Sequence, residues 1–280
     1  MTTIPQVQEI FIHPVKGLTG QQCDRTTLIP GHGIAGDRGF ALLFLDENLV
    51  DHLGEKLTDI NWQENQTVNW LSKKYFAVQN DWPGLACLQC DYQHSTGFFR
   101  VKQGRILVLE ADLRSLEQRK KVDEFFTNYL QTLTPNPGAR HPQMAPVKLV
   151  GDGCTSRYPD RNIHHISLIG QGTLDELSRK IGEPVSAARF RANFVIAGLP
   201  AWQEFQWLEQ QLFLGEVKIQ VTAKIGRCLN IEVNPLTGER DLALLKLLKT
   251  EYDHTDTGIL ATVETAGEVS INDHLRLSDY

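Results

Sequence analysis

Two short segments in the second half of the chain, residues 189–196 and 227–233, alternate polar and apolar side chains. A two-residue period is typical of a β-strand, in which neighbouring side chains point to opposite faces. In the first segment Arg189, Arg191 and Asn193 therefore share one face, and apolar side chains share the other. The apolar face predicts a strand that packs on a core. The row of two guanidinium groups and an amide favours an anionic, hydrogen-bonding ligand over bare solvent.

The second segment predicts a cysteine that faces away from the core. Arg227 shares one strand face with the apolar side chains of the segment, whereas Cys228 lies on the opposite face with Asn230 and Glu232. A cysteine that only fills space more often points into a core. We therefore predict that Cys228 presents its thiol for chemistry and that the Arg227 side chain leaves the strand on the other side.

These residues carry a resemblance to a known family. The sequences RFRAN at residues 189–193, GRC at 226–228 and NPLTGE at 234–239 are similar to motifs of the MOSC (molybdenum cofactor sulfurase C-terminal) domain family. The chain as a whole resembles the branch that includes the mitochondrial amidoxime-reducing component and its bacterial relatives. One position departs from the family pattern, because Ala192 stands where Pro is usual. This change alters backbone stiffness and removes no ligand group.

The resemblance extends to the N-terminal half. IHPVKG at residues 12–17 is similar to the family's N-terminal barrel motif, with Gly17 in place of the usual Ser, and Asp37-Arg38 is similar to the family's DR pair. The resemblance implies that Lys16 and Arg38 contact the cofactor. From the residues alone, a turn lysine is more often solvated and a neighbouring Asp-Arg pair is more often a local ion pair of small energetic worth.

The resemblance also implies a molybdenum cofactor, in which a pyranopterin holds the metal. In the family the cysteine of the RC motif is a thiolate ligand of molybdenum, and this role falls on Cys228, which is also the candidate catalytic residue. Molybdenum accepts soft sulfur donors such as a thiolate. No pyridoxal phosphate site is expected. The predicted cofactor-binding residues are Lys16, Arg38, Arg189, Arg191, Asn193, Arg227 and Cys228, of which Lys16, Arg38, Arg191 and Asn193 are assigned to the pterin and its phosphate.

The predicted fold class is α+β and predominantly β. The resemblance specifies an N-terminal β-barrel-like domain followed by a MOSC β-barrel domain with a few helices. Residues 134–142 contain three prolines and a glycine, a composition that interrupts regular structure, and they are predicted to form a linker. The predicted domains are therefore residues 1–133 and 143–280, with the cofactor between them.

Local patterns predict the main elements. Apolar side chains at helical spacing predict helices over residues 113–130 and 241–249. Residues 173–181 predict a further helix, which Gly182 ends. Two strand-like runs around a Lys-Gln-Gly turn predict a hairpin over residues 98–110.

The composition favours a cytoplasmic protein. The formal net charge is −6, so no global basic field favours nucleic acid or a membrane surface. No apolar run approaches the ~20 residues that span a bilayer, and the N-terminus lacks a signal-peptide pattern. Five scattered cysteines, an odd number, favour free thiols in a reducing compartment. Cys87 and Cys90 form a C-x-x-C motif without a second ligand pair, which favours structural thiols over a metal site.

Three functions are consistent with these residues. The first is a molybdenum-cofactor-dependent oxidoreductase that takes an oxygen atom from N-hydroxylated or related N-oxygenated compounds. Its electrons would come from a ferredoxin-like, flavoprotein or cytochrome partner, because the sequence carries no flavin fingerprint, haem motif or iron–sulfur cysteine set. The second is a sulfur carrier with a persulfide on Cys228. The third is a non-catalytic protein that binds the molybdenum cofactor.

Overall fold

The computed structural model describes residues 4–46, 61, 66–141, 146–161 and 164–278. Strands dominate this part of the chain, and its three α-helices are α1 (Leu116–Thr132), α2 (Gln171–Ile181) and α3 (Leu244–Tyr252). The predicted α+β class with predominant β structure is therefore confirmed. Within the same residues, no helix combines the length and the apolar character that crossing a membrane requires.

The largest sheet has eight strands in the order β17-β13-β14-β15-β11-β12-β1-β3. Most neighbouring strands are antiparallel, but β11 and β12 are parallel, and the connection between them contains α2. The apolar side chains of these strands form the larger core cluster. The strands are β1 (Gln6–Ile12), β3 (Gln21–Cys23), β11 (Ile166–Gly170), β12 (Phe194–Ala197), β13 (Gln211–Leu214), β14 (Val217–Gly226), β15 (Asp256–Val263) and β17 (Leu275–Leu277).

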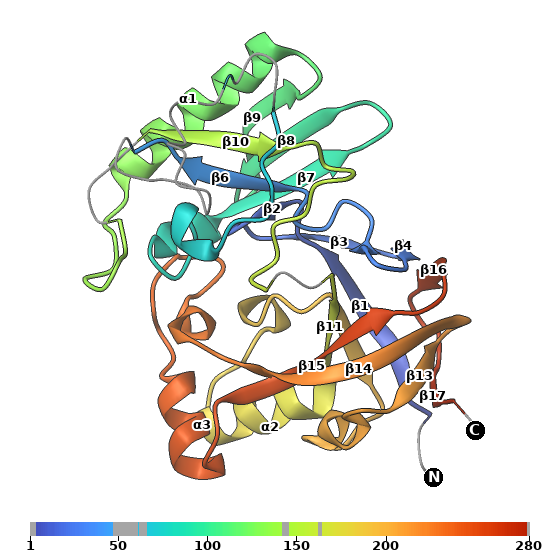
Figure 1. The fold of residues 1–280 in the computed structure, drawn as a ribbon. Coiled ribbons are helices and arrows are strands. Elements are labelled where there is room, and N and C mark those ends of the chain that lie inside the picture. The colour runs from blue at the N-terminus through green and yellow to red at the C-terminus, as the bar shows by residue number, and fades with distance from the viewer. Residues whose placement is uncertain (1–3, 47–60, 62–65, 142–145, 162–163, 279–280) are drawn as a thin grey trace.

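Three smaller sheets have the orders β10-β6-β2, β16-β4-β5 and β7-β8-β9. In Figure 1, α1 covers β9 and β10 at one end of the molecule, and α2 and α3 lie beside the largest sheet at the other. A second core cluster joins Phe126 of α1 to Phe40 and Phe99. The strands are β2 (Val15–Lys16), β4 (Arg25–Ile29), β5 (Gly33–Ile34), β6 (Phe40–Phe44), β7 (Leu88–Gln93), β8 (Phe98–Gln103), β9 (Ile106–Asp112), β10 (Val147–Gly151) and β16 (Gly267–Ser270).

Strand pairing crosses the predicted linker in both directions. β1, from the N-terminal half, pairs with β12, and β4 pairs with β16. β10, from the C-terminal half, pairs with β6. The division into residues 1–133 and 143–280 therefore stays a prediction about sequence segments, whereas the sheets combine strands from both. Residue 142, the last of the predicted linker, and residues 143–145 after it lie outside the described residues.

The barrels expected from the family resemblance are not confirmed. The eight-stranded sheet has β17 and β3 as its edges, and no closed barrel is found among the described residues. A single bridge between Gln6 and His274 brings the start of β1 beside the segment that leads into β17. Barrel closure stays a prediction.

Both segments that alternate polar and apolar side chains were wrongly predicted as strands along their length. In the first, residues 187–189 form a 3₁₀ turn, Arg191 has a left-handed backbone with φ of 54°, and β12 starts only at Phe194. In the second, β14 ends at Gly226, and residues 229–232 form another 3₁₀ turn. The alternation was real in the sequence, but turn geometry rather than strand geometry orients these side chains.

The elements with strong local patterns are present with shifted starts. The predicted hairpin is formed by β8 and β9. α1 begins at Leu116 rather than at residue 113, because the Ser115 hydroxyl accepts a hydrogen bond from the Gln118 backbone N–H at 3.3 Å and caps the helix. α2 ends at Gly182 as predicted, where φ is 80°. α3 covers residues 244–252 rather than 241–249.

Candidate active site

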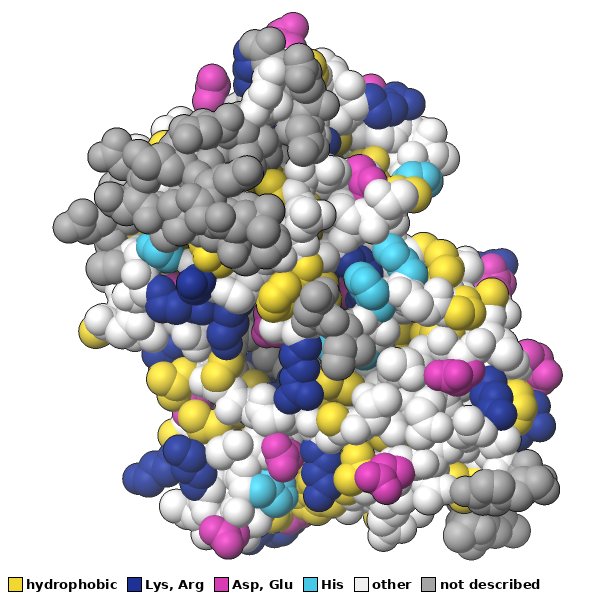
Figure 2. Space-filling model, viewed as in Figure 1, with side chains coloured by type: hydrophobic (Ala, Val, Ile, Leu, Met, Phe, Trp, Pro, Cys, Tyr) yellow, Lys and Arg dark blue, Asp and Glu magenta, His cyan; other side chains and the backbone are white. Residues whose placement is uncertain are grey.

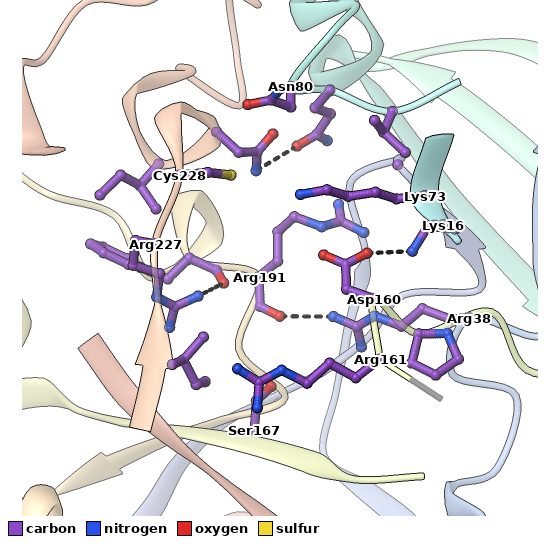
Figure 3. A pocket seen from close by; sticks show the side chains of 18 of the residues that line it. Lys16, Arg38, Lys73, Asn80, Asp160, Arg161, Ser167, Arg191, Arg227 and Cys228 are labelled. Carbon is purple, nitrogen blue, oxygen red and sulfur yellow. Dashed lines mark hydrogen bonds and ion pairs between the residues drawn. The ribbon is translucent and has the colours of Figure 1, made fainter. Parts of the chain in front are cut away.

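A pocket of about 230 Å³ lies where β2, the end of β14 and the loops before β11 and β12 meet. The side chains from both halves of the chain that line it include all seven residues of the predicted set. Figure 3 labels Lys16, Arg38, Arg191, Arg227 and Cys228 among them. Figure 2 shows basic side chains gathered around a hollow in this face of the molecule. We call it the cationic pocket, after the eight basic residues in its lining: Lys16, Arg38, Lys73, Arg157, Arg161, Arg189, Arg191 and Arg227.

Cys228 is exposed, and it immediately precedes the 3₁₀ turn of residues 229–232 after β14. Its sulfur lies on the wall of the pocket in Figure 3. The side chain of the neighbouring Arg227 is hydrogen-bonded to other segments of the protein and so holds this turn in place. Its Nε donates to the Thr257 hydroxyl at 2.6 Å and its Nη1 to the Phe190 carbonyl oxygen at 2.9 Å. Burial lowers the pKa of Arg227 to about 10, so the group stays charged at neutral pH. Arg227 therefore positions Cys228, and its hydrogen bonds go to the protein.

Arg38 and Arg191 lie deeper in the pocket and contact each other through the backbone. The Nη2 of Arg38 donates to the Arg191 carbonyl oxygen at 3.1 Å, and the Nη1 of Arg191 donates to the Leu18 carbonyl oxygen. Burial lowers the pKa of Arg191 to about 10, with Arg38 adding to the effect. Two guanidinium groups therefore face one pocket.

The buried carboxylate of Asp37 joins several residues of the pocket wall. Asp37 is fully buried and accepts hydrogen bonds from Nη2 of Arg157 at 2.9 Å, Nδ2 of Asn193 at 3.1 Å and the His13 backbone N–H at 2.9 Å, as well as from Arg38. Burial alone would raise the pKa of Asp37, but the charges of Arg38 and Arg157 outweigh burial and hold that pKa well below its ordinary range. Asp37 is thus an ionised, buried counter-charge for two arginines of the cationic pocket, Arg38 and Arg157.

Lys16 ends β2 and is 5% exposed at its side chain. Its Nζ donates to the Tyr158 carbonyl oxygen at 3.0 Å and to the carboxylate of Asp160, whose side chain is 69% exposed. Burial lowers the pKa of Lys16, and the Lys16 charge in turn lowers the pKa of Asp160. Gly17, which replaces the family's usual Ser, has φ of 87°, and a Cβ there would lie 2.7 Å from the Ala77 carbonyl oxygen. No side chain fits at residue 17.

Arg189 and Asn193 contribute structure to the wall of the pocket. Arg189 is paired with Asp241 at 2.7 Å and donates to the Glu232 carbonyl oxygen at 3.1 Å, which ties its turn to the turn after Cys228. The Oδ1 of Asn193 accepts hydrogen bonds from the backbone N–H and hydroxyl of Ser167 at 3.1 and 2.9 Å. Their assignment to the cofactor stays a prediction.

Several pocket residues were not predicted from the sequence. Arg157, Asp160 and Arg161 belong to a polar stretch before β11, and Lys73 comes from the segment after β6; no site residue was predicted in either. His165 also lines the pocket, and burial together with Arg38 and Arg157 lowers its pKa to about 4. The one available signal was the density of charged residues between two apolar strands.

The residue types fit an anionic cofactor anchored through sulfur. Cys228 supplies a soft donor to the pocket, and the basic residues supply charge for an oxyanion. Within the described part of the chain, no three His, Cys, Asp or Glu side chains gather to hold a metal ion. A metal at Cys228 would therefore take its other ligands from an organic group or solvent.

Comparisons with known proteins agree with this reading. Residues 156–276 match the MOSC domain model. The chain is similar to mitochondrial amidoxime-reducing component 1 of Xenopus laevis, with 26% identity over 148 residues, 49% of this chain and 42% of that protein. It is similar to mitochondrial amidoxime reducing component 2 of Rattus norvegicus, with 27% identity over 45% of this chain and 39% of that protein. It also matches molybdenum cofactor sulfurase of Caenorhabditis elegans, with 37% identity over 29% of this chain and 12% of that protein.

The chain thus matches about two fifths of the length of these amidoxime-reducing components. The MOSC match includes the wall of the pocket that carries Arg191, Arg227 and Cys228, and Lys16 and Arg38 complete the pocket from outside the matched residues. The motifs, the pocket and the matched domain lead to one conclusion: residues 156–276 match the MOSC domain family, and the chain resembles the amidoxime-reducing branch of that family.

Proposed function

We propose that this chain is a molybdenum-cofactor-dependent oxidoreductase that reduces N-hydroxylated compounds. The observation that carries the proposal is the exposed thiol of Cys228 on the wall of a pocket that basic side chains from both halves of the chain also line. The names of similar proteins refer to the reduction of amidoximes, which are N-hydroxylated amidines. The same chemistry is proposed here for this chain.

Each pocket residue has a definite part in this proposal. Cys228 would be the protein ligand of molybdenum, and Arg227 would hold its turn in place through Thr257 and Phe190. Lys16, Arg38 and Arg191 would neutralise the pterin phosphate, for which planar guanidinium groups are well suited. When bound, the cofactor supplies the two-electron chemistry and accepts the oxygen atom.

The protein side chains also set the environment of the reaction. Ile225, Phe190 and Ile231 contribute apolar lining to the same pocket. The buried carboxylate of Asp37, which is paired with Arg157, also holds Arg38 in place in the wall of the pocket. Preorganised charges of this kind lower the cost of binding an anion, because they need little rearrangement when it arrives.

The proposed reaction needs a separate electron donor. Reductive cleavage of an N–O bond consumes two electrons and two protons and releases the amine or amidine and water. We propose that a ferredoxin-like protein, a flavoprotein or a cytochrome delivers the electrons. The donor would dock on the face onto which the cationic pocket opens, because electron transfer needs a short path to the metal.

The test is turnover of an N-hydroxylated amidine by the purified, molybdenum-loaded protein with a chemical reductant. The proposal predicts formation of the amidine and its loss in Cys228→Ser. Cys154→Ser is the matched control, because Cys154 is also exposed and does not line the pocket. Bound cofactor without turnover of any N-hydroxylated compound would support a cofactor-binding protein instead. A persulfide on Cys228 in the intact mass, without molybdenum, would support a sulfur carrier.

A further inference from the structure

Most basic residues of the cationic pocket already have partners within the protein. Six of the eight make hydrogen bonds or ion pairs to backbone or carboxylate oxygens. Their charges face the pocket, but their positions are fixed by these partners. They are Lys16, Arg38, Arg157, Arg189, Arg191 and Arg227.

Lys73 and Arg161 differ from the other six. Both line the pocket, and neither side chain makes a hydrogen bond or ion pair within the part of the chain that the structure describes. Lys73 is partly buried at the start of a 3₁₀ turn, and Arg161 is exposed in the loop before β11. In Figure 3 both side chains extend across the pocket toward the wall that carries Cys228 and Arg227.

The charges of both side chains act on titratable groups of the pocket. Lys16 has the largest effect in lowering the pKa of Asp160, and Lys73 adds to it. Burial has the largest effect in lowering the pKa of His165, and Arg161 contributes with Arg38 and Arg157.

The charge of the pocket is strongly unbalanced. Asp160 is the one carboxylate in its described lining, and it is ion-paired with Lys16. The described lining therefore holds eight basic side chains and one carboxylate, and that carboxylate is already paired with Lys16. An anionic substrate group would form ion pairs with Lys73 and Arg161, whereas a neutral substrate would not.

We infer that Lys73 and Arg161 form a substrate-selecting pair that favours N-hydroxylated compounds carrying a carboxylate or similar oxyanion. This inference rests on the proposed function and names the substrate class for the same pocket. Arg161 offers a planar fork that matches a carboxylate, and Lys73 offers a compact charge on a flexible stem. Because both side chains remain in contact with water, each ion pair adds little to the binding free energy. The selectivity comes from the sum of the two contributions.

The experiment compares two ligands that differ in charge and little in shape, N-hydroxy-4-carboxybenzamidine and its 4-carboxamide. Their dissociation constants are measured by calorimetry on the molybdenum-loaded protein without a reductant, so that binding is recorded and turnover is not. The carboxylate is expected to bind about five- to tenfold more tightly than the carboxamide, the size expected for two partly screened ion pairs. High ionic strength should reduce this ratio, because salt screens exposed charges.

Lys73→Met and Arg161→Met are each expected to lower the ratio, and the double variant is expected to bring it close to one. Lys73→Arg should keep it, because the charge is retained. Lys74→Met is the control, since Lys74 is the exposed neighbour that contacts the Tyr75 ring and does not line the pocket. Equal binding of the two ligands by the parent protein would overturn the inference. So would an unchanged ratio in the double variant, with or without loss of molybdenum. Preferential carboxylate binding without turnover, once a reductant is added, would contradict the proposed function and leave this inference standing.

Discussion

Arg38 donates a hydrogen bond to the carbonyl oxygen of Arg191 at 3.1 Å, and both residues have left-handed backbones, with φ of 52° and 54°. This conformation costs a non-glycine residue roughly 1 kcal/mol or more and persists where the surroundings impose it. Here the contact joins the N-terminal half of the chain to the turn before β12. It directs two guanidinium groups into one pocket.

Replacing Arg38 with lysine should separate charge from geometry. Arg38→Lys keeps the positive charge but loses the planar fork that reaches both Asp37 and the Arg191 carbonyl oxygen. Urea denaturation should show a loss of about 1–3 kcal/mol in the free energy of unfolding. Arg100→Lys is the control, because Arg100 forms an exposed pair with Glu110 and should change stability by less than about 0.5 kcal/mol. Equal effects of the two substitutions would contradict this role of Arg38.

Removing the buried carboxylate should have a larger effect. Asp37→Asn leaves Arg157 and part of Arg38 without a counter-charge in a buried setting, which typically costs about 3–5 kcal/mol. The sign of the pH dependence follows from the lowered pKa of Asp37. Its contribution is present above the ordinary carboxyl pKa and is lost as the pH falls toward the lower pKa of the folded state. Acid unfolding of the parent and variant, followed by circular dichroism, checks both statements, and parallel curves would refute them.

His165 should give stability a second pH dependence, closer to neutrality. Its pKa falls from 6.5 to about 4 in the folded protein, so the unfolded chain binds the proton more readily. Stability is therefore full above about 6.5 and decreases as the pH falls toward 4. His165→Gln should flatten the unfolding free energy across this window, by on the order of 2 kcal/mol for a partly buried ring. If the variant kept the full pH dependence of the unfolding free energy, groups other than His165 would be its source.

Asp160 should compete with added anions for Lys16. Its exposed carboxylate occupies the Lys16 ammonium in the structure, and a phosphate in the same place would meet the same charge. Asp160→Asn should bind inorganic phosphate about two- to fivefold more tightly in cofactor-free protein, measured by thermal shift against phosphate concentration. Asp91→Asn, on the distant β7 pair with Arg100, should not change phosphate affinity. Weaker phosphate binding by Asp160→Asn would show that Asp160 supports the anion site.

The sequence predicted the residues of the pocket better than their backbone. Arg191 and Cys228 were placed facing a ligand on the assumption of strands, and both do face the pocket, but from turns. A left-handed Arg191 has no signature in its own residue type, because its conformation depends on contacts with Arg38 and Leu18. The motif identified the side chains, and only the fold explains their directions.

Contacts between residues far apart in the sequence could not be predicted from local sequence patterns. The hairpin of β8 and β9 and the helix α1 depend on short-range spacing, and the sequence predicted them. The pairing of β1 with β12 joins segments separated by most of the chain. The ion pair of Asp37 with Arg157 also joins residues far apart in the sequence, and no periodicity or change in composition indicates it.

Molybdenum content gives the decisive comparison for a thiolate-anchored cofactor in this pocket. The parent protein, Cys228→Ser and Cys154→Ser are purified from the same molybdate-supplied host, and the metal per chain is measured by mass spectrometry. The parent and Cys154→Ser should each carry close to one molybdenum per chain, and Cys228→Ser should lose most of it. Full molybdenum content in Cys228→Ser would contradict the assignment of Cys228 as the protein ligand.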